Sequence, residues 1–130
     1  MKKITPDKQK ALSLMSMAEK TLERINETDL NLYTSNILKD YYDVIHGLLD
    51  AINCLDGIKI SGEGAHEKLI NHISKIYNLE EVERIFLQEL RMYRNRISYE
   101  GLFIEPDYIN RNKEKILKII KKLKDIINKK

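Results

Sequence analysis

Two arginines, an amide and a phenol lie close together in one short stretch of the chain, YRNRISYEGLF at residues 93–103. The guanidinium of Arg94 is suited to hold a phosphate group, and the amide of Asn95 can orient that group. Tyr99 follows and brings a hydroxyl that can donate a hydrogen bond. These residue types indicate either a site for an anionic ligand or a polar helix end, in which Arg94 bonds the last carbonyls and Tyr99 packs on the bundle.

The spacing of the apolar residues places this stretch at the end of a helix. Arg94 follows the apolar Tyr93, about 100° around the helix axis, so it lies at the edge of the buried face. Asn95 continues a polar row that includes Arg91. Because Arg94 and Tyr99 are five residues apart, they meet on one side only if the last turn loosens.

A second polar row is predicted on an earlier helix. Tyr42, His46, Asp50 and Asn53 recur at steps of four, four and three, so they share one helix face. The rest of this helix is apolar, and histidine ionises near neutral pH. The row either lines a cleft, in which His46 and Asp50 take part in binding, or is a solvated surface.

Other combinations are excluded by their spacing. His66 and His72 are six residues apart, not the four that place two imidazoles on one metal ion, so we expect no metal site. The glycines at 62–64 are not followed by the Lys-Ser/Thr pair of a phosphate-binding loop, and no cofactor is expected. Cys54 is the only cysteine, so we expect a buried thiol in a reducing cytoplasm.

Length and composition are those of one ordinary globular domain, residues 1–130, with 42% hydrophobic and 33% charged residues. No apolar run approaches the roughly 20 residues of a membrane span, and no apolar segment follows the basic N-terminus. We therefore expect a soluble cytoplasmic protein without membrane contact.

Positive charge gathers at the C-terminal end. Residues 107–130 contain nine Lys or Arg and three Asp or Glu, a local excess of +6, within a net charge of +3. This segment either attracts a polyanion or is a lysine-rich solvated helix whose dipole favours cations at its end.

Apolar residues at steps of three and four predict five helices. The first begins at Thr5-Pro6-Asp7 and carries Leu12, Met15, Ala18, Leu22 and Ile25; the second, capped by Thr34 or Ser35, runs to Gly57. After a glycine-rich loop, a third helix carries Leu69 to Ile76 and ends near Asn78. A fourth helix runs from about Leu79 through Val82 to Ile97, and the last helix begins at Pro106.

Five amphipathic helices with short connections predict an all-α fold, an antiparallel bundle with a four-helix core and a C-terminal helix. The apolar stripe of the second helix is wide enough to serve a core and also an adjoining subunit.

The stretch RNRISYEG resembles the signature of the HEPN superfamily of small helical-bundle domains. The resemblance covers the order of the helices and is specific only in the fourth helix. The family signature is an arginine, commonly a polar residue such as Asn, and then a histidine; here Arg94 and Asn95 match, and Tyr99 occupies the histidine position.

The resemblance implies a homodimer in which two copies of the motif face each other. In such proteins the arginine stabilises phosphate charge, and the histidine helps an RNA 2′-hydroxyl attack its neighbouring phosphate without a metal. Some members are toxins paired with a nucleotidyltransferase-like antitoxin; others serve antiviral defence or bind nucleotides.

Tyr99 departs from this pattern, since a phenol with a pKa near ~10 shuttles protons poorly compared with an imidazole near ~6.5. We therefore expect an HEPN-like module that binds RNA or a nucleotide through Arg91, Arg94, Asn95 and Asp50 without catalysis. One alternative is a metal-independent endoribonuclease toxin that uses Arg94, Asn95 and Tyr99, with His46 replacing the lost imidazole. The other is a dimeric partner of a nucleotidyltransferase-like antitoxin.

Overall fold

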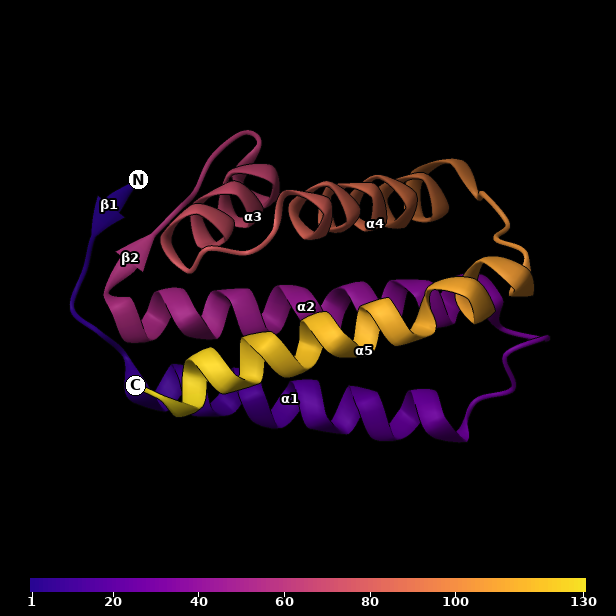
Figure 1. Ribbon diagram of the computed structural model, residues 1–130, viewed down its shortest axis with the longest axis horizontal. Helices are drawn as coiled ribbons and strands as arrows, with labels where there is room; N and C mark the ends of the chain where they lie inside the picture. The colour runs from indigo at the N-terminus through magenta and orange to yellow at the C-terminus, as the bar shows by residue number, and fades with distance from the viewer.

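A computed structural model describes all residues, 1–130. It confirms the all-α bundle of five helices (Figure 1). The elements are β1 (Lys2–Lys3), α1 (Lys8–Glu27), α2 (Thr34–Asp56), β2 (Ile58–Lys59), α3 (Ala65–Ile76), α4 (Glu81–Glu100) and α5 (Pro106–Asn128).

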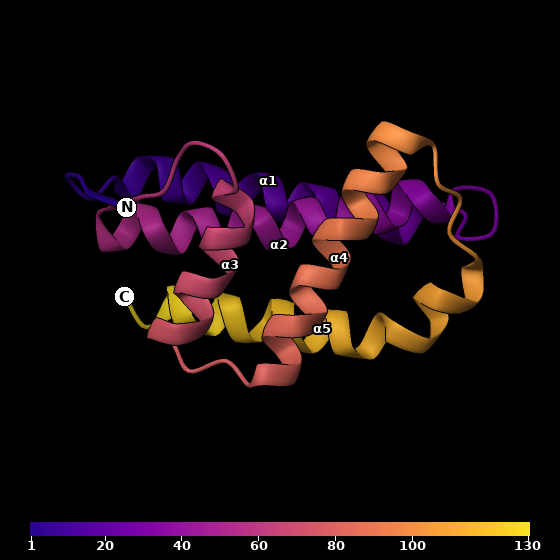
Figure 2. The ribbon, with the colours of Figure 1, turned by 90° about the horizontal axis from the view of Figure 1, so that it is seen from above.

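α1, α2 and α5 run lengthwise through the molecule. α3 and α4 lie on α2, on the side away from α1 (Figure 1). Seen from above, α3 and α4 cross the long helices and run antiparallel to each other (Figure 2). α1 and α2 are also antiparallel, whereas α5 runs in the direction of α2 because α4 and the connection after it carry the chain back to the start of α2.

α2 is the centre of the fold, since it contacts every other helix. Its apolar stripe is almost completely buried, with the predicted core residues Ile37, Leu38, Tyr41, Val44, Ile45, Leu48, Leu49 and Ile52 all inside. Because partners cover it on so many sides, the width of the stripe is explained within one chain.

The structure corrects the predicted capping residues of two helices, α1 and α2, and one predicted loop. Asp7, not Thr5, caps α1 by accepting a hydrogen bond from the amide of Lys10 (2.9 Å). Ser35 does not cap α2; its hydroxyl accepts from the amide of Ile104 (2.8 Å) and so fastens the α4–α5 connection to α2. The hydroxyl of Thr34 does not cap α2 either, because it donates a hydrogen bond to the carbonyl of Leu30. Within the predicted glycine-rich loop, β2 pairs with β1, which residue patterns in strands this short do not reveal.

Three residues assigned to the core are exposed: Leu12, Ile76 and Val82. Spacing shows which residues share a face of a helix but not how far along that helix a partner reaches. α3 and α4 cross α2 instead of lying along it, so part of each apolar pattern stays outside the contact.

Gly57 ends α2 with φ of 68°, in the left-handed region that favours glycine. The carbonyl of Gly57 accepts a hydrogen bond from the amide of Ile4. A Cβ atom on Gly57 would lie 2.6 Å from the carbonyl oxygen of Ile4. The N-terminal segment therefore closes over a position that only glycine can occupy.

We expect Gly57→Ala to lower the free energy of unfolding by about 1–3 kcal/mol, through backbone strain and through the clash with Ile4. Gly101→Ala is the matched control, because Gly101 has the same φ but nothing within 4 Å of a Cβ. Urea denaturation of both variants measures the difference. Equal losses would show that the contact with Ile4 contributes nothing.

Candidate functional site

Polar side chains from α2, α3 and α4 converge at one place on the bundle. Figure 2 shows α3 and α4 crossing the long helices. We call Tyr42, His46, His66, Arg91 and Arg94 the imidazole–guanidinium cluster. The rings of His46 and His66 are in contact, with centroids 4.1 Å apart and planes tilted by 39°. Helices far apart in sequence therefore bring two imidazoles together beside two arginines.

α2 supplies one side of the cluster. Tyr42 and His46 are one turn apart, with ring centroids 6.0 Å apart, and Asp50 follows one turn later. Oδ2 of Asp50 lies 3.4 Å from Nδ1 of His46. The polar row of α2 thus places a carboxylate beside the His46 ring.

α4 supplies the two guanidinium groups, both of which are largely covered. Nε of Arg91 donates to Oε1 of Gln88 (2.7 Å), which holds the side chain in place. The carboxylate nearest to Arg91 is that of Glu67, at 4.0 Å. Nε of Arg94 is 3.8 Å from Oδ1 of Asp43. Both separations exceed hydrogen-bond distance, so neither arginine donates to a carboxylate.

Two buried donors in the cluster have no hydrogen-bond partner: the hydroxyl of Tyr42 and Nε of Arg94. Such groups are rare because an unpaired buried donor costs about 1–3 kcal/mol. Tyr42 and Arg94 therefore each keep one donor that an acceptor on a ligand can engage, beside the carboxylates of Asp43, Asp50 and Glu67.

Burial raises the pKa of Tyr42 to about 12, although Arg91 and Arg94 act in the opposite direction. Partial burial lowers the pKa of His66. His46, Arg94 and Arg91 lower this pKa further, whereas Asp50 raises it. At pH 7 the phenol of Tyr42 and the imidazole of His66 are therefore neutral.

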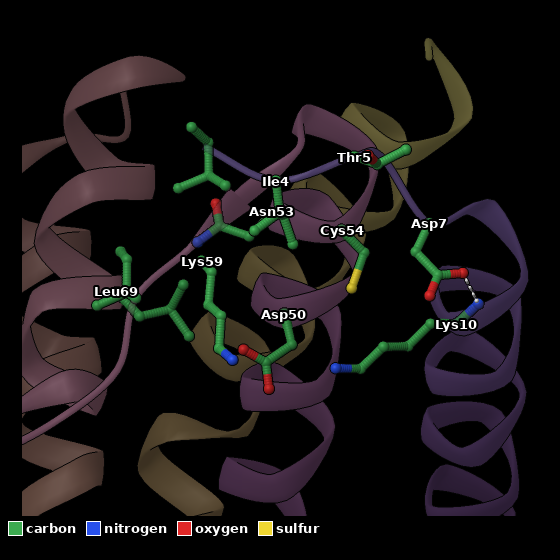
Figure 3. A pocket seen from close by; sticks show the side chains of 11 residues that line it. Ile4, Thr5, Asp7, Lys10, Asp50, Asn53, Cys54, Lys59 and Leu69 are labelled. Atoms are coloured by element: carbon green, nitrogen blue, oxygen red, sulfur yellow. Dashed lines mark hydrogen bonds between the residues drawn. The ribbon is translucent and has the colours of Figure 1, made fainter. Parts of the chain in front are cut away.

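A pocket of about 420 Å³ lies next to the cluster and is lined in part by Asp50, the neighbour of His46 (Figure 3). The side chains of Lys10 and Lys59 extend into this pocket toward Asp50. Asn53, the last member of the polar row, is buried in the pocket wall. Cys54 is buried there too, as expected, and burial raises the pKa of its thiol.

The structure does not bring Arg94, Asn95 and Tyr99 of the fourth helix together in one site. α4 remains helical through Glu100, so Arg94 and Tyr99 point about 140° apart around its axis. Tyr99 is 81% exposed, and the side chain of Asn95 makes no hydrogen bond. The condition for Arg94 and Tyr99 to meet, a loosened last turn, is not fulfilled.

The polar helix end does not cap α4 either. The amide of Gly101, in the left-handed region, donates to the carbonyl of Ile97 (3.2 Å), and the amide of Leu102 donates to that of Arg96 (3.3 Å). Backbone groups thus satisfy the last carbonyls, and the interpretation of Arg94 as a capping residue is wrong, as is that of Tyr99 as packed on the bundle.

Three members of the predicted site, His46, Arg91 and Arg94, do lie in the cluster, with Asp50 beside it. His66 and Tyr42 complete it, although neither was assigned a role in binding. Tyr42 belongs to the predicted polar row of α2. The part of His66 depends on how α3 packs on α2, which spacing within one helix does not reveal.

No family model, no curated protein and no solved structure matches this chain. No helix is both long enough and apolar enough to cross a membrane. Nowhere do three or more His, Cys, Asp or Glu side chains gather in a way that could hold a metal ion. The site must therefore be interpreted from its own chemistry.

Proposed function

We propose that the imidazole–guanidinium cluster binds the phosphate backbone of single-stranded RNA, or the phosphate of a nucleotide. The observation that carries this proposal is the pair of covered guanidinium groups, Arg91 and Arg94, neither of which donates to a carboxylate. A guanidinium held in place by its neighbours loses little freedom when it binds phosphate. His46 and His66 offer ring faces on which a base can stack.

The test is fluorescence anisotropy with a labelled single-stranded RNA, repeated over a range of salt concentrations. If phosphates dominate the contact, the affinity should fall steeply as the salt concentration rises. A single-stranded DNA and a mononucleotide serve as competitors and separate RNA from nucleotide recognition. Absence of binding at low salt would contradict the proposal.

Affinity should also depend on pH. His66 is neutral at pH 7 because its pKa lies below the ordinary ~6.5, and a bound anion favours the charged imidazolium. We therefore expect RNA binding to tighten severalfold as the pH falls from 7 toward 5, and His66→Asn to reduce that gain. His72→Asn, also on α3 but outside the cluster, is the control. An equal pH response in both variants would contradict a role for His66.

A second candidate function is metal-independent cleavage of RNA. The contact between His46 and His66, with Asp50 beside the former, favours it, because one imidazole can accept the proton of a 2′-hydroxyl while the other protonates the leaving 5′-oxygen. Attack of the 2′-oxygen on the phosphorus then breaks the bond to the 5′-oxygen and leaves a 2′,3′-cyclic phosphate. Incubation with RNA in EDTA tests this reaction: cleavage lost in both His46→Gln and His66→Gln supports it, and intact RNA contradicts it.

A further inference from the structure

The outer side of α4 carries a row of exposed apolar residues that the bundle does not bury. These residues, Val82, Ile85, Met92 and Tyr99, are each more than half exposed, as is Phe103 just beyond the helix. Glu89, which accepts a hydrogen bond from the hydroxyl of Tyr108 on α5, and Arg96, 3.6 Å from Glu100, complete the row, which we call the outer stripe. The buried residues Leu87 and Leu90 lie on the other side of the same helix.

The spacing of the outer stripe is that of a helix-packing seam. Residues 82, 85, 89, 92, 96 and 99 follow one another at steps of three, four, three, four and three. This repeat of 3.5 residues drifts only about 20° per seven residues around a straight helix and is the pattern by which one helix packs on another in a coiled coil. From Val82 to Tyr99 the seam extends about 25 Å, at 1.5 Å per residue.

The charges within the stripe select the partner. Glu89 lies three residues before Met92, and Arg96 lies four residues after it. A parallel copy of α4 would place glutamate against glutamate and arginine against arginine. An antiparallel copy, related by a two-fold axis near Met92, brings each Glu89 within reach of the other copy's Arg96.

The same arrangement matches the apolar residues. It places Val82 and Ile85 of one copy near Tyr99 and Phe103 of the other. Hollows of about 480 and 490 Å³ flank the stripe at Ile85 and can accept large side chains. We propose that a second copy of this chain covers the outer stripe, with the two α4 helices antiparallel about a two-fold axis near Met92.

This dimer differs from the one that the HEPN resemblance implies. Arg94 is two residues from Met92, about 200° around α4, so it faces away from the partner. Two copies of the motif would not face each other, and each copy would keep its imidazole–guanidinium cluster open to RNA. The inference is independent of the proposed function, since it rests only on the outer face of α4.

Sedimentation equilibrium tests the proposal. We expect twice the mass of one chain for the wild type in the micromolar range, and a monomer for Met92→Glu, which places two carboxylates together at the axis. Met17→Glu on α1 is the matched control, because Met17 is exposed to a similar extent outside the stripe, and it should remain dimeric. Circular dichroism verifies that each variant is folded. A monomeric wild type, or equal dimerisation of the two variants, would overturn the proposal.

A charge exchange tests the antiparallel orientation. Glu89→Arg and Arg96→Glu, each alone, place like charges across the interface and should weaken the dimer at least about tenfold. The double variant restores opposite charges and should recover most of the wild-type affinity. Failure of the double variant to recover would overturn the antiparallel arrangement. RNA binding by Met92→Glu, measured in parallel, separates failure of the dimer from failure of the proposed RNA site.

Discussion

Arg94→Gln is expected to weaken RNA binding about ten- to a hundredfold, the effect of losing one hydrogen bond between charged groups, at about 1.5–3 kcal/mol. Arg94 contributes a charge that no carboxylate engages by hydrogen bonding, and its Nε is a buried donor without an acceptor. The substitution removes the charge while it keeps a polar side chain of similar length. Fluorescence anisotropy at fixed low salt measures the loss.

Two control variants make this result specific. Arg111→Gln on α5 removes the same charge from an exposed arginine that pairs with Asp107, and it should change the affinity little. Arg94→Lys keeps the charge but loses the planar donor group and should give an intermediate affinity. Equal losses in Arg94→Gln and Arg111→Gln would indicate nonspecific attraction by net charge.

Leu49→Ala is expected to lower the free energy of unfolding by about 2–5 kcal/mol. Leu49 is completely buried in α2, the helix that contacts all others, so its loss leaves a cavity that rigid neighbours cannot fill. Urea denaturation monitored by circular dichroism measures the change.

Leu12→Ala is the matched control for this substitution. Leu12 belongs to the same kind of apolar pattern in α1 but is 55% exposed, and we expect a loss of about 1 kcal/mol or less. Comparable losses at both positions would mean that α2 is not the centre of the core.

The pair Leu49 and Leu12 also shows how far sequence patterns determine this fold. The 3.6-residue period identified all five helices because each helix buries one face. It placed Leu12 and Val82 in the core because the period identifies a face without revealing where along it a partner helix ends. The crossing of α4 over α2 is a tertiary property, and it leaves Val82 outside.

The candidate site, like the fold, could be predicted from the sequence only in part. Two sequence features, the arginines of the fourth helix and the polar row of the second, both contribute to the cluster. Tyr99 was grouped with Arg94 by proximity in sequence, but a regular helix separates them around its axis. His66 was missed because only the packing of α3 on α2 brings its ring to His46.

We propose two roles for α4: one edge presents arginines to RNA, and the outer stripe binds a second copy. The two surfaces are separable by mutation, because Arg94 and Met92 lie on nearly opposite sides of the helix. Monomeric Met92→Glu that still binds RNA, and dimeric Arg94→Gln that does not, would establish both roles.

The most direct test of the central claim, that RNA phosphate binds at the imidazole–guanidinium cluster, is a titration of the protein with single-stranded RNA followed by NMR of the histidine side chains. The chain has three histidines, of which His46 and His66 belong to the cluster and His72 does not. We predict that the ring resonances of His46 and His66 shift with RNA concentration while those of His72 remain unchanged. Shifts confined to His72, or binding without any change at His46 and His66, would contradict the account.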